Sequence, residues 1–155
     1  MELYWVNGVF AVATRPRGGD WLRDDLAAAQ LRGVRHVVSC LTPAEESELG
    51  LQDELEVAQS LGLEFSRVPI EDFGTPQLSG FGEVLSRIKR TSVPQAKIAI
   101  HCRQALGRSP LVAAAMLVRD GMSPAEAWEA IAKARGRAVP ETEEQRAWLT
   151  RFANS

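Results

Sequence analysis

One segment decides the fold, K-I-A-I-H-C-R-Q-A-L-G-R-S-P at residues 97–110. Its first five residues form a short apolar run typical of a buried strand. Ser109-Pro110 then begins a helix that is apolar almost all round as far as Arg119, so we expect that helix to be buried on most sides. Proteins of the α/β class place their sites at the carboxyl ends of such strands. The segment therefore predicts that Cys102 lies at a functional edge of a sheet.

The rest of the chain alternates between strand and helix patterns. We expect strands at 3–12 (a hairpin turning at Asn7-Gly8), 34–41, 63–70 and 97–101. We expect helices at 21–31 with Asp20 as the cap, after the capping box of Thr42, and at 52–61, 78–90, 110–119, 124–136 and from Thr142 onward. The pattern predicts an α/β fold, with a central, mostly parallel sheet of about four or five strands and helices on both faces.

Composition limits the classes of function. The chain has 155 residues, enough for one domain over 1–155, and a net charge of −2 makes nucleic-acid binding improbable. The longest apolar run is far below the ~20 residues of a membrane span, and the first residues do not form a secretory signal. Two cysteines, Cys40 and Cys102, make no disulfide framework. We expect a cytoplasmic protein without a membrane or nucleic-acid partner, and a monomer is favoured.

The loop between strand and helix has the chemistry of an anion site. Inward backbone N–H groups would form a nest, and the helix N-terminus adds about half a positive charge. Arg108 adds a planar fork matched to two phosphate oxygens. The same positive field favours the thiolate of Cys102, the reactive form of a cysteine. Ser109 can donate to the thiolate when it leaves, and His101 can support the loop through its backbone.

His101, Cys102, Gly107, Arg108 and Ser109 match the signature H-C-x5-R-[ST], so the chain resembles the cysteine-dependent protein tyrosine phosphatase superfamily. It looks most like the small dual-specificity branch, including bacterial members. The resemblance implies a phosphocysteine intermediate at Cys102, no metal and no cofactor. It also implies that the phosphate is bound by the loop residues, Arg103, Gln104, Ala105, Leu106, Gly107 and Arg108. Ala105 departs from the glycine often found there.

The family supplies a general acid from an upstream loop, often with the pattern W-P-D-x-G-x-P. The segment E-D-F-G-T-P at residues 71–76 resembles it at Asp72, Gly74 and Pro76, 30 residues before Cys102. The resemblance implies that Asp72 protonates the leaving oxygen and then activates water. Glu71 is the less favoured alternative.

Several alternatives stay open. The same chemistry could act on a phosphoinositide, a nucleotide or an RNA 5′-phosphate rather than on protein Tyr and Ser/Thr. A rhodanese-type sulfurtransferase also uses a cysteine in an anion-binding loop, and a phospho-binding module without activity is a third possibility. Only Arg103 is basic among the variable loop positions, which favours a phosphorylated protein as the substrate.

Other polar residues receive no catalytic role at this point. Gln145 is expected to complete a capping box with Thr142, and Glu141 lies where larger relatives carry a water-positioning glutamine. Cys40 is expected to be a core thiol, with a reversible disulfide to Cys102 as a weaker hypothesis. The adjacent His101 and Cys102, taken with His36 and Cys40, match no zinc spacing, so no metal site is predicted.

Overall fold

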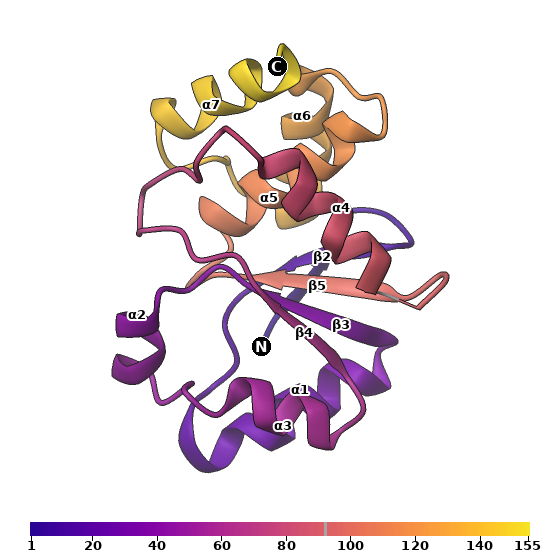
Figure 1. The fold of residues 1–155 in the computed structure, drawn as a ribbon, viewed down its shortest axis with the longest axis vertical. Helices are drawn as coiled ribbons and strands as arrows, with labels where there is room; N and C mark the ends of the chain where they lie inside the picture. The colour runs from indigo at the N-terminus through magenta and orange to yellow at the C-terminus, as the bar shows by residue number, and fades with distance from the viewer. Residues whose placement is uncertain (92) are drawn as a thin grey trace.

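The structure is a computed structural model in which residues 1–91 and 93–155 are described. It has a central five-stranded sheet with helices on both faces (Figure 1). In chain order the strands are β1 (Leu3–Trp5), β2 (Phe10–Ala13), β3 (Val34–Ser39), β4 (Glu64–Arg67) and β5 (Lys97–His101). The predicted α/β class is thereby confirmed.

The sheet is mostly parallel, as predicted. Its order is β1-β2-β5-β3-β4; β1 and β2 pair antiparallel, and each of the other neighbours pairs in parallel. The Asn7 side chain closes the hairpin, because its Oδ1 accepts the N–H groups of Val9 and Phe10 at 2.8 and 3.0 Å. Since β5 lies between two parallel neighbours, its carboxyl end falls at the middle of the sheet edge, where α/β sheets bind ligands.

Helices cover the two faces unequally. They are α1 (Leu22–Leu31), α2 (Pro43–Glu48), α3 (Glu54–Ser60), α4 (Phe81–Thr91), α5 (Arg108–Arg119), α6 (Pro124–Arg135) and α7 (Glu143–Ala153). Figure 1 shows α1 and α3 on one face and α4 to α7 on the other. As its apolar sequence predicts, α5 is buried from Arg108 to Leu117. Among the described residues, no helix combines the length and the apolar character needed to cross a membrane.

Several predicted boundaries were wrong, among them the start of α1, the end of β4 and the start of α4. Asp20 does not cap α1, because the N–H of Gly19 binds the carbonyl of Gly50 at 3.1 Å and residues Gly19–Trp21 form a 3-10 turn instead. Strand β4 ends at Arg67 rather than Ile70, although the N–H groups of Val68 and Ile70 still bind the carbonyls of Ser39 and Cys40 at 2.8 and 3.1 Å. Helix α4 starts at Phe81 rather than Leu78, because Gly80 has a φ of +80°, outside the helical region.

Candidate active site

The loop after β5 curls from Cys102 to Gly107 before α5 begins at Arg108. The Cys102 thiol is almost fully buried, and its Sγ lies 3.2 Å from the Ser109 Oγ. Ala105 adopts a φ of +59°, a left-handed conformation that suits glycine better and costs an L-residue about 1–2 kcal/mol. Arg135 compensates by donating from Nε to the Ala105 carbonyl at 3.1 Å and from NH2 to the Gln104 carbonyl at 3.2 Å.

His101 supports the loop from inside the sheet. Its Nδ1 lies 3.3 Å from the carbonyl of Cys102, as the sequence predicted. Its Nε2 lies 2.7 Å from Oε2 of Glu54, and both side chains are fully buried. Glu54 could not be predicted as the partner of His101, because the two residues lie 47 positions apart and the sequence around Glu54 is that of an ordinary helix start.

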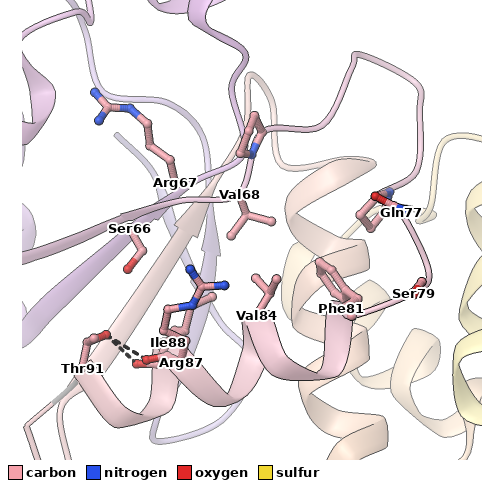
Figure 2. Close-up of a pocket in the computed structure, with 13 residues that line it drawn as sticks. Ser66, Arg67, Val68, Gln77, Ser79, Phe81, Val84, Arg87, Ile88 and Thr91 are labelled. Atoms are coloured by element: carbon pink, nitrogen blue, oxygen red, sulfur yellow. Dashed lines mark hydrogen bonds between the residues drawn. The ribbon is translucent and has the colours of Figure 1, made fainter.

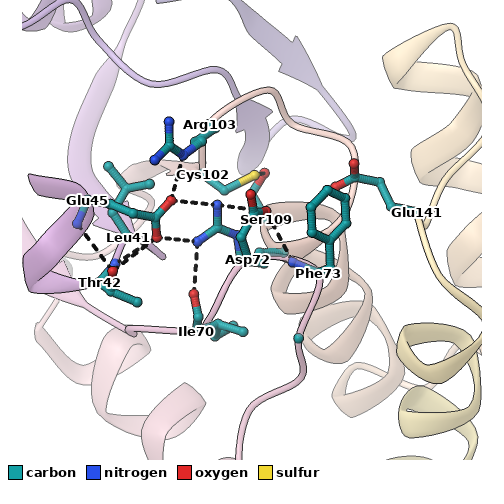
Figure 3. Close-up of polar contacts among 12 residues, drawn as sticks. Leu41, Thr42, Glu45, Ile70, Asp72, Phe73, Cys102, Arg103, Ser109 and Glu141 are labelled. Atoms are coloured by element: carbon teal, nitrogen blue, oxygen red, sulfur yellow. Dashed lines mark hydrogen bonds and ion pairs between the residues drawn. The ribbon is translucent and has the colours of Figure 1, made fainter. Parts of the chain in front are cut away.

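Arg108 is held in a fixed orientation by three hydrogen bonds (Figure 3). Its NH1 donates to Oε1 of Glu45 at 2.7 Å and to the Ile70 carbonyl at 2.8 Å, and its NH2 donates to Oε2 of Glu45 at 3.0 Å. The guanidinium is 2% exposed. A buried arginine with a two-oxygen partner loses little freedom when it binds an anion, so the fork is preorganised.

Glu45 is a functional residue that the sequence interpretation missed. It was predicted only as part of a capping box, which the structure confirms through the Thr42 hydroxyl and backbone N–H. Burial alone would raise the pKa of Glu45, but hydrogen bonds from Arg108, Arg103 and Thr42 outweigh it and lower the pKa to about 2. Its carboxylate is therefore a fixed counter-charge for the arginine.

Arg103 binds the Glu45 carboxylate from the solvent-exposed side. Its Nε donates to Oε2 of Glu45 at 2.7 Å, and its NH2 donates to Oε2 of Glu48 at 3.0 Å. The Arg103 guanidinium therefore binds two carboxylates in this structure. The sequence predicted Arg103 as a substrate-binding residue. Arg103 still lines the cavity described below.

Asp72 approaches Arg108 from the loop that follows β4. Its Oδ1 lies 3.1 Å from NH2 of Arg108 and also accepts the N–H of Phe73 at 3.1 Å. Phe73 has a φ of +62° and leaves its ring 58% exposed beside the carboxylate. Such strained conformations gather at functional sites.

A cavity of about 100 Å³ lies between these groups. It is lined by Asp72, Phe73, Cys102, Arg103, Gln104, Arg108 and Glu141. Its volume is that of about three water molecules in the liquid, so it suits a phosphate group and not a whole substrate. Of the predicted site residues, Ala105, Leu106, Gly107 and Ser109 are not among those that line it, and the alternative acid Glu71 is not either.

Glu141 and Gln145 connect the cavity to α7. Gln145 forms the predicted capping box with Thr142, but its Nε2 also donates to the Gly74 carbonyl at 3.1 Å, and its Oε1 accepts the N–H of Glu141 at 3.1 Å. Gly107 has no room for a side chain, since a Cβ there would lie 2.5 Å from Oε1 of Glu141. Burial and then the negative charge of Asp72 raise the pKa of Glu141, against the opposing effect of Arg108.

Cys40 lies just beyond β3, next to the site. Its N–H donates to the His101 carbonyl at 2.8 Å. Burial, and then the charge of Cys102, raise the pKa of Cys40 well above its usual value. Both cysteines are free thiols in this structure, and the redox disulfide stays a prediction.

A larger groove, of about 430 Å³, adjoins the loop that carries Asp72. It lies between β4 and α4 (Figure 2) and shares Pro69 and Pro76, the two ends of that loop. Figure 2 shows the Arg87 side chain extending over an apolar floor that includes Val68 and Ile88.

The fold and this arrangement define a class of protein. A cysteine at the end of a central parallel strand, an arginine at the start of the next helix and an aspartate on a facing loop are the parts of the cysteine-dependent tyrosine and dual-specificity phosphatases. Residues 11–122 match the family described as "Tc-R-P: Polymorphic toxin system, DSP-PTPase phosphatase". The chain belongs to this family.

Curated relatives agree with this assignment. The rat "Cyclin-dependent kinase inhibitor 3" is 29% identical over 133 residues, which cover 84% of this chain and 63% of the rat protein. The Leishmania major "Protein tyrosine phosphatase PRL-1" is 29% identical over 132 residues, covering 79% and 70%. The chain thus spans less than two thirds of the cyclin-dependent kinase inhibitor 3 relatives that it matches.

Solved structures share the whole fold. The active form of Tk-PTP is 28% identical and superimposes with a TM-score of 0.82, covering 98% of this chain and 96% of Tk-PTP. Kinase associated phosphatase, with its catalytic cysteine replaced by serine, has a TM-score of 0.84 over 99% of this chain and 94% of its own. At 24% identity, that second likeness supports the fold alone.

Proposed function

We propose that this chain hydrolyses phosphomonoesters on protein tyrosine, and on serine and threonine, through a phosphocysteine intermediate. One observation carries the proposal: the Cys102 thiol, the Arg108 guanidinium and the Asp72 carboxylate line a single cavity of about 100 Å³. These are the nucleophile, the anion-binding fork and the acid that phosphoryl transfer to sulfur requires. Family membership favours this chemistry over a sulfurtransferase.

In the first step the Cys102 thiolate attacks phosphorus, and the bond to the leaving oxygen breaks. Asp72, protonated at this stage, gives its proton to that oxygen. Arg108 and the loop amides of residues 103–108 hold the three equatorial oxygens, where the charge of the transition state is spread. Because Glu45 fixes Arg108 in advance, little reorganisation is needed when the substrate binds.

In the second step water attacks the phosphorus of the phosphocysteine and gives one proton to a carboxylate that lines the cavity. The bond between phosphorus and sulfur breaks, and the thiolate leaves with the electron pair. The Ser109 hydroxyl, 3.2 Å from Sγ, donates to the departing thiolate. His101 and Glu54 keep the loop closed around the phosphate through the Cys102 carbonyl. None of these steps calls for a cofactor.

Phosphoproteins are the proposed substrates, in the cytoplasm and with the chain as a monomer. The exposed ring of Phe73 stands at the mouth of the cavity, where it can pack against the ring of a phosphotyrosine. The relatives named above as tyrosine phosphatases support the same substrate class.

The test is turnover of an aryl phosphate in the presence of a metal chelator, with the wild type and Cys102→Ser. The proposal expects activity in the wild type and a loss of about 10⁴-fold or more in the variant. Cys40→Ala, which removes the other thiol, is the matched control and keeps most of the activity. Equal activity in wild type and Cys102→Ser would overturn the proposal. A panel of phosphopeptides and phosphoinositides then separates protein from lipid substrates.

A further inference from the structure

Two carboxylates flank the cavity, and their surroundings differ. Asp72 comes from the loop after β4, and Glu141 comes from the segment that precedes α7. Figure 3 shows both side chains beside the ring of Phe73 and near Cys102. The expectation drawn from the family resemblance gives both proton transfers to Asp72 and none to Glu141.

The Asp72 carboxylate already has partners. Its Oδ1 is engaged by NH2 of Arg108 and by the N–H of Phe73, each at 3.1 Å. An ion pair of this kind is the arrangement expected after Asp72 has given its proton to the leaving group.

The Glu141 carboxylate, in contrast to that of Asp72, is available to accept a proton. Within residues 1–91 and 93–155, no hydrogen bond or ion pair to its Oε atoms is found. The charged groups that act on it are Asp72 and Arg108, and the balance of burial and these charges raises its pKa. A carboxylate with a raised pKa accepts a proton from water more readily at the working pH.

The backbone holds Glu141 at this place. Gln145, which is fully buried, accepts the N–H of Glu141 at 3.1 Å and donates to the Gly74 carbonyl at 3.1 Å. The same side chain thus ties Glu141 to the loop that carries Asp72. Gly107 leaves the space above the phosphate loop that Oε1 of Glu141 occupies.

We propose that the two carboxylates divide the work, with Asp72 as the acid of the first step and Glu141 as the base of the second. This inference rests on the proposed function. Water attacks the phosphorus of phosphocysteine and gives one proton to Glu141. The bond between phosphorus and sulfur breaks, and Cys102 leaves as the thiolate. Inorganic phosphate departs, Glu141 returns its proton to the solvent, and Asp72 takes up a proton from the solvent, which restores the acid for the next turnover.

The experiment is rapid-quench kinetics with an activated aryl phosphate, which resolves formation of the intermediate from its hydrolysis. Glu141→Gln keeps the size of the side chain and removes the base. We expect the first turnover to keep its rate within about 2-fold and the steady-state rate to fall about 100-fold. Phosphocysteine then accumulates on Cys102, where peptide mass spectrometry detects it. Glu143→Gln, an exposed neighbour, is the matched control and changes neither phase.

A second measurement separates a base from a merely structural residue. The rate of hydrolysis of the intermediate in the wild type should rise with pH through the raised pKa of Glu141, because only the ionised form accepts the proton. In Glu141→Gln the rate of hydrolysis should no longer rise with pH. Glu141→Asp should recover part of the rate and part of its pH dependence.

The outcomes distinguish the two proposals. Suppose that the wild type forms phosphocysteine, but Glu141→Gln slows formation and hydrolysis of the intermediate equally, or slows neither. The proposal that Glu141 is the base of the second step is then wrong, while the phosphatase proposal stands. If the wild type forms no adduct on Cys102 and Cys102→Ser is as active, the proposed function itself fails.

Discussion

The inner wall behind the cavity and the rim of the cavity use carboxylates in opposite ways. The inner wall is defined as Glu45, Glu54, His101 and Arg108, of which Arg108 lines the cavity and the other three lie behind it. Every carboxylate of the inner wall has a buried cationic or imidazole partner. In the rim, defined as Asp72, Phe73 and Glu141, the carboxylates face the cavity, and Glu141 has a raised pKa. The inner wall keeps charges fixed, whereas the rim is suited to proton transfer.

The comparison shows how one small cavity can bind an anion while acidic side chains surround it. Glu45 has a pKa of about 2 and so stays ionised, which holds the Arg108 guanidinium in a fixed orientation for an anion. The two regions should therefore respond differently to mutation. Inner-wall changes should affect both stability and catalysis, and rim changes should affect catalysis alone.

The largest effect is expected for Arg108→Lys. A lysine cannot bind Glu45 and two phosphate oxygens with one planar fork, so kcat/KM for an aryl phosphate should fall about 10³-fold or more. Arg103→Lys changes the same residue type on the exposed side of Glu45 and should cost much less. Equal losses in the two variants would remove the distinction between a buried fork and a surface ion pair.

Asp72→Asn should lower kcat by about 100-fold for phosphotyrosine, whose leaving oxygen needs a proton. The loss should shrink for aryl phosphates with acidic phenols, which leave without help. The measurement is a plot of rate against the pKa of the leaving phenol. Glu71→Gln, on the neighbouring carboxylate outside the cavity, should match the wild type. A loss confined to Glu71→Gln would assign the acid to the other residue.

Glu45→Gln should destabilise the fold as well as slow the reaction. It leaves the buried Arg108 without its counter-charge, which should lower the free energy of unfolding by about 3 kcal/mol in urea titrations. Glu48→Gln removes an exposed partner of Arg103 and should cost about 1 kcal/mol or less. Similar costs for both would show that burial does not set the strength of this network.

Stability should fall at acid pH. The pKa of Glu45 lies at about 2 in the folded chain and at its ordinary value of 4.5 in the unfolded chain. The contribution is therefore complete above pH 4.5 and is lost as the pH falls towards 2, because the unfolded chain takes up the proton first. Asp25 adds the same sign of effect below 3.8, since hydrogen bonds from Arg17 outweigh burial and lower its pKa to about 2. Urea titrations across this range should show a shallower acid slope for Glu45→Gln, and an unchanged slope would contradict the shift.

The smallest effect is expected for Phe73→Ala. The ring is exposed and makes the mouth of the cavity, so its loss should raise KM for phosphotyrosine peptides by about 2- to 10-fold. Phosphoserine peptides, which have no ring, should change little. A uniform change for both peptides would show that Phe73 shapes the loop and does not contact substrate.

Much of the fold was predictable because its signals are local. The strand at 97–101 was predicted with its observed ends, and the capping boxes at Thr42 and Thr142 were both found. The start of α1 was less predictable, because it depends on the contact of Gly19 with Gly50.

The residues of the candidate site also differ in how far they could be predicted from local signals. The loop from Cys102 to Arg108 and the position of Asp72 follow from short motifs, and the structure brings these residues together. Glu45 and Glu54 could not be found from short motifs, since their partners lie 63 and 47 residues away. Glu141 was noted from its position in the sequence but received no catalytic role, because the sequence does not show that its side chain lines the cavity. Only the folded chain shows which carboxylates are neutralised by a partner and which face the cavity.

The most direct measurement is identification of the phosphorylated residue during turnover. Wild type is mixed with an aryl phosphate, quenched within the first turnover and digested for mass spectrometry. The account predicts a phosphoryl group on the peptide that carries Cys102, at nearly one per chain in Glu141→Gln and none in Cys102→Ser. Hydrolysis that proceeds with no covalent adduct in any variant, or with the adduct on another residue, would contradict it.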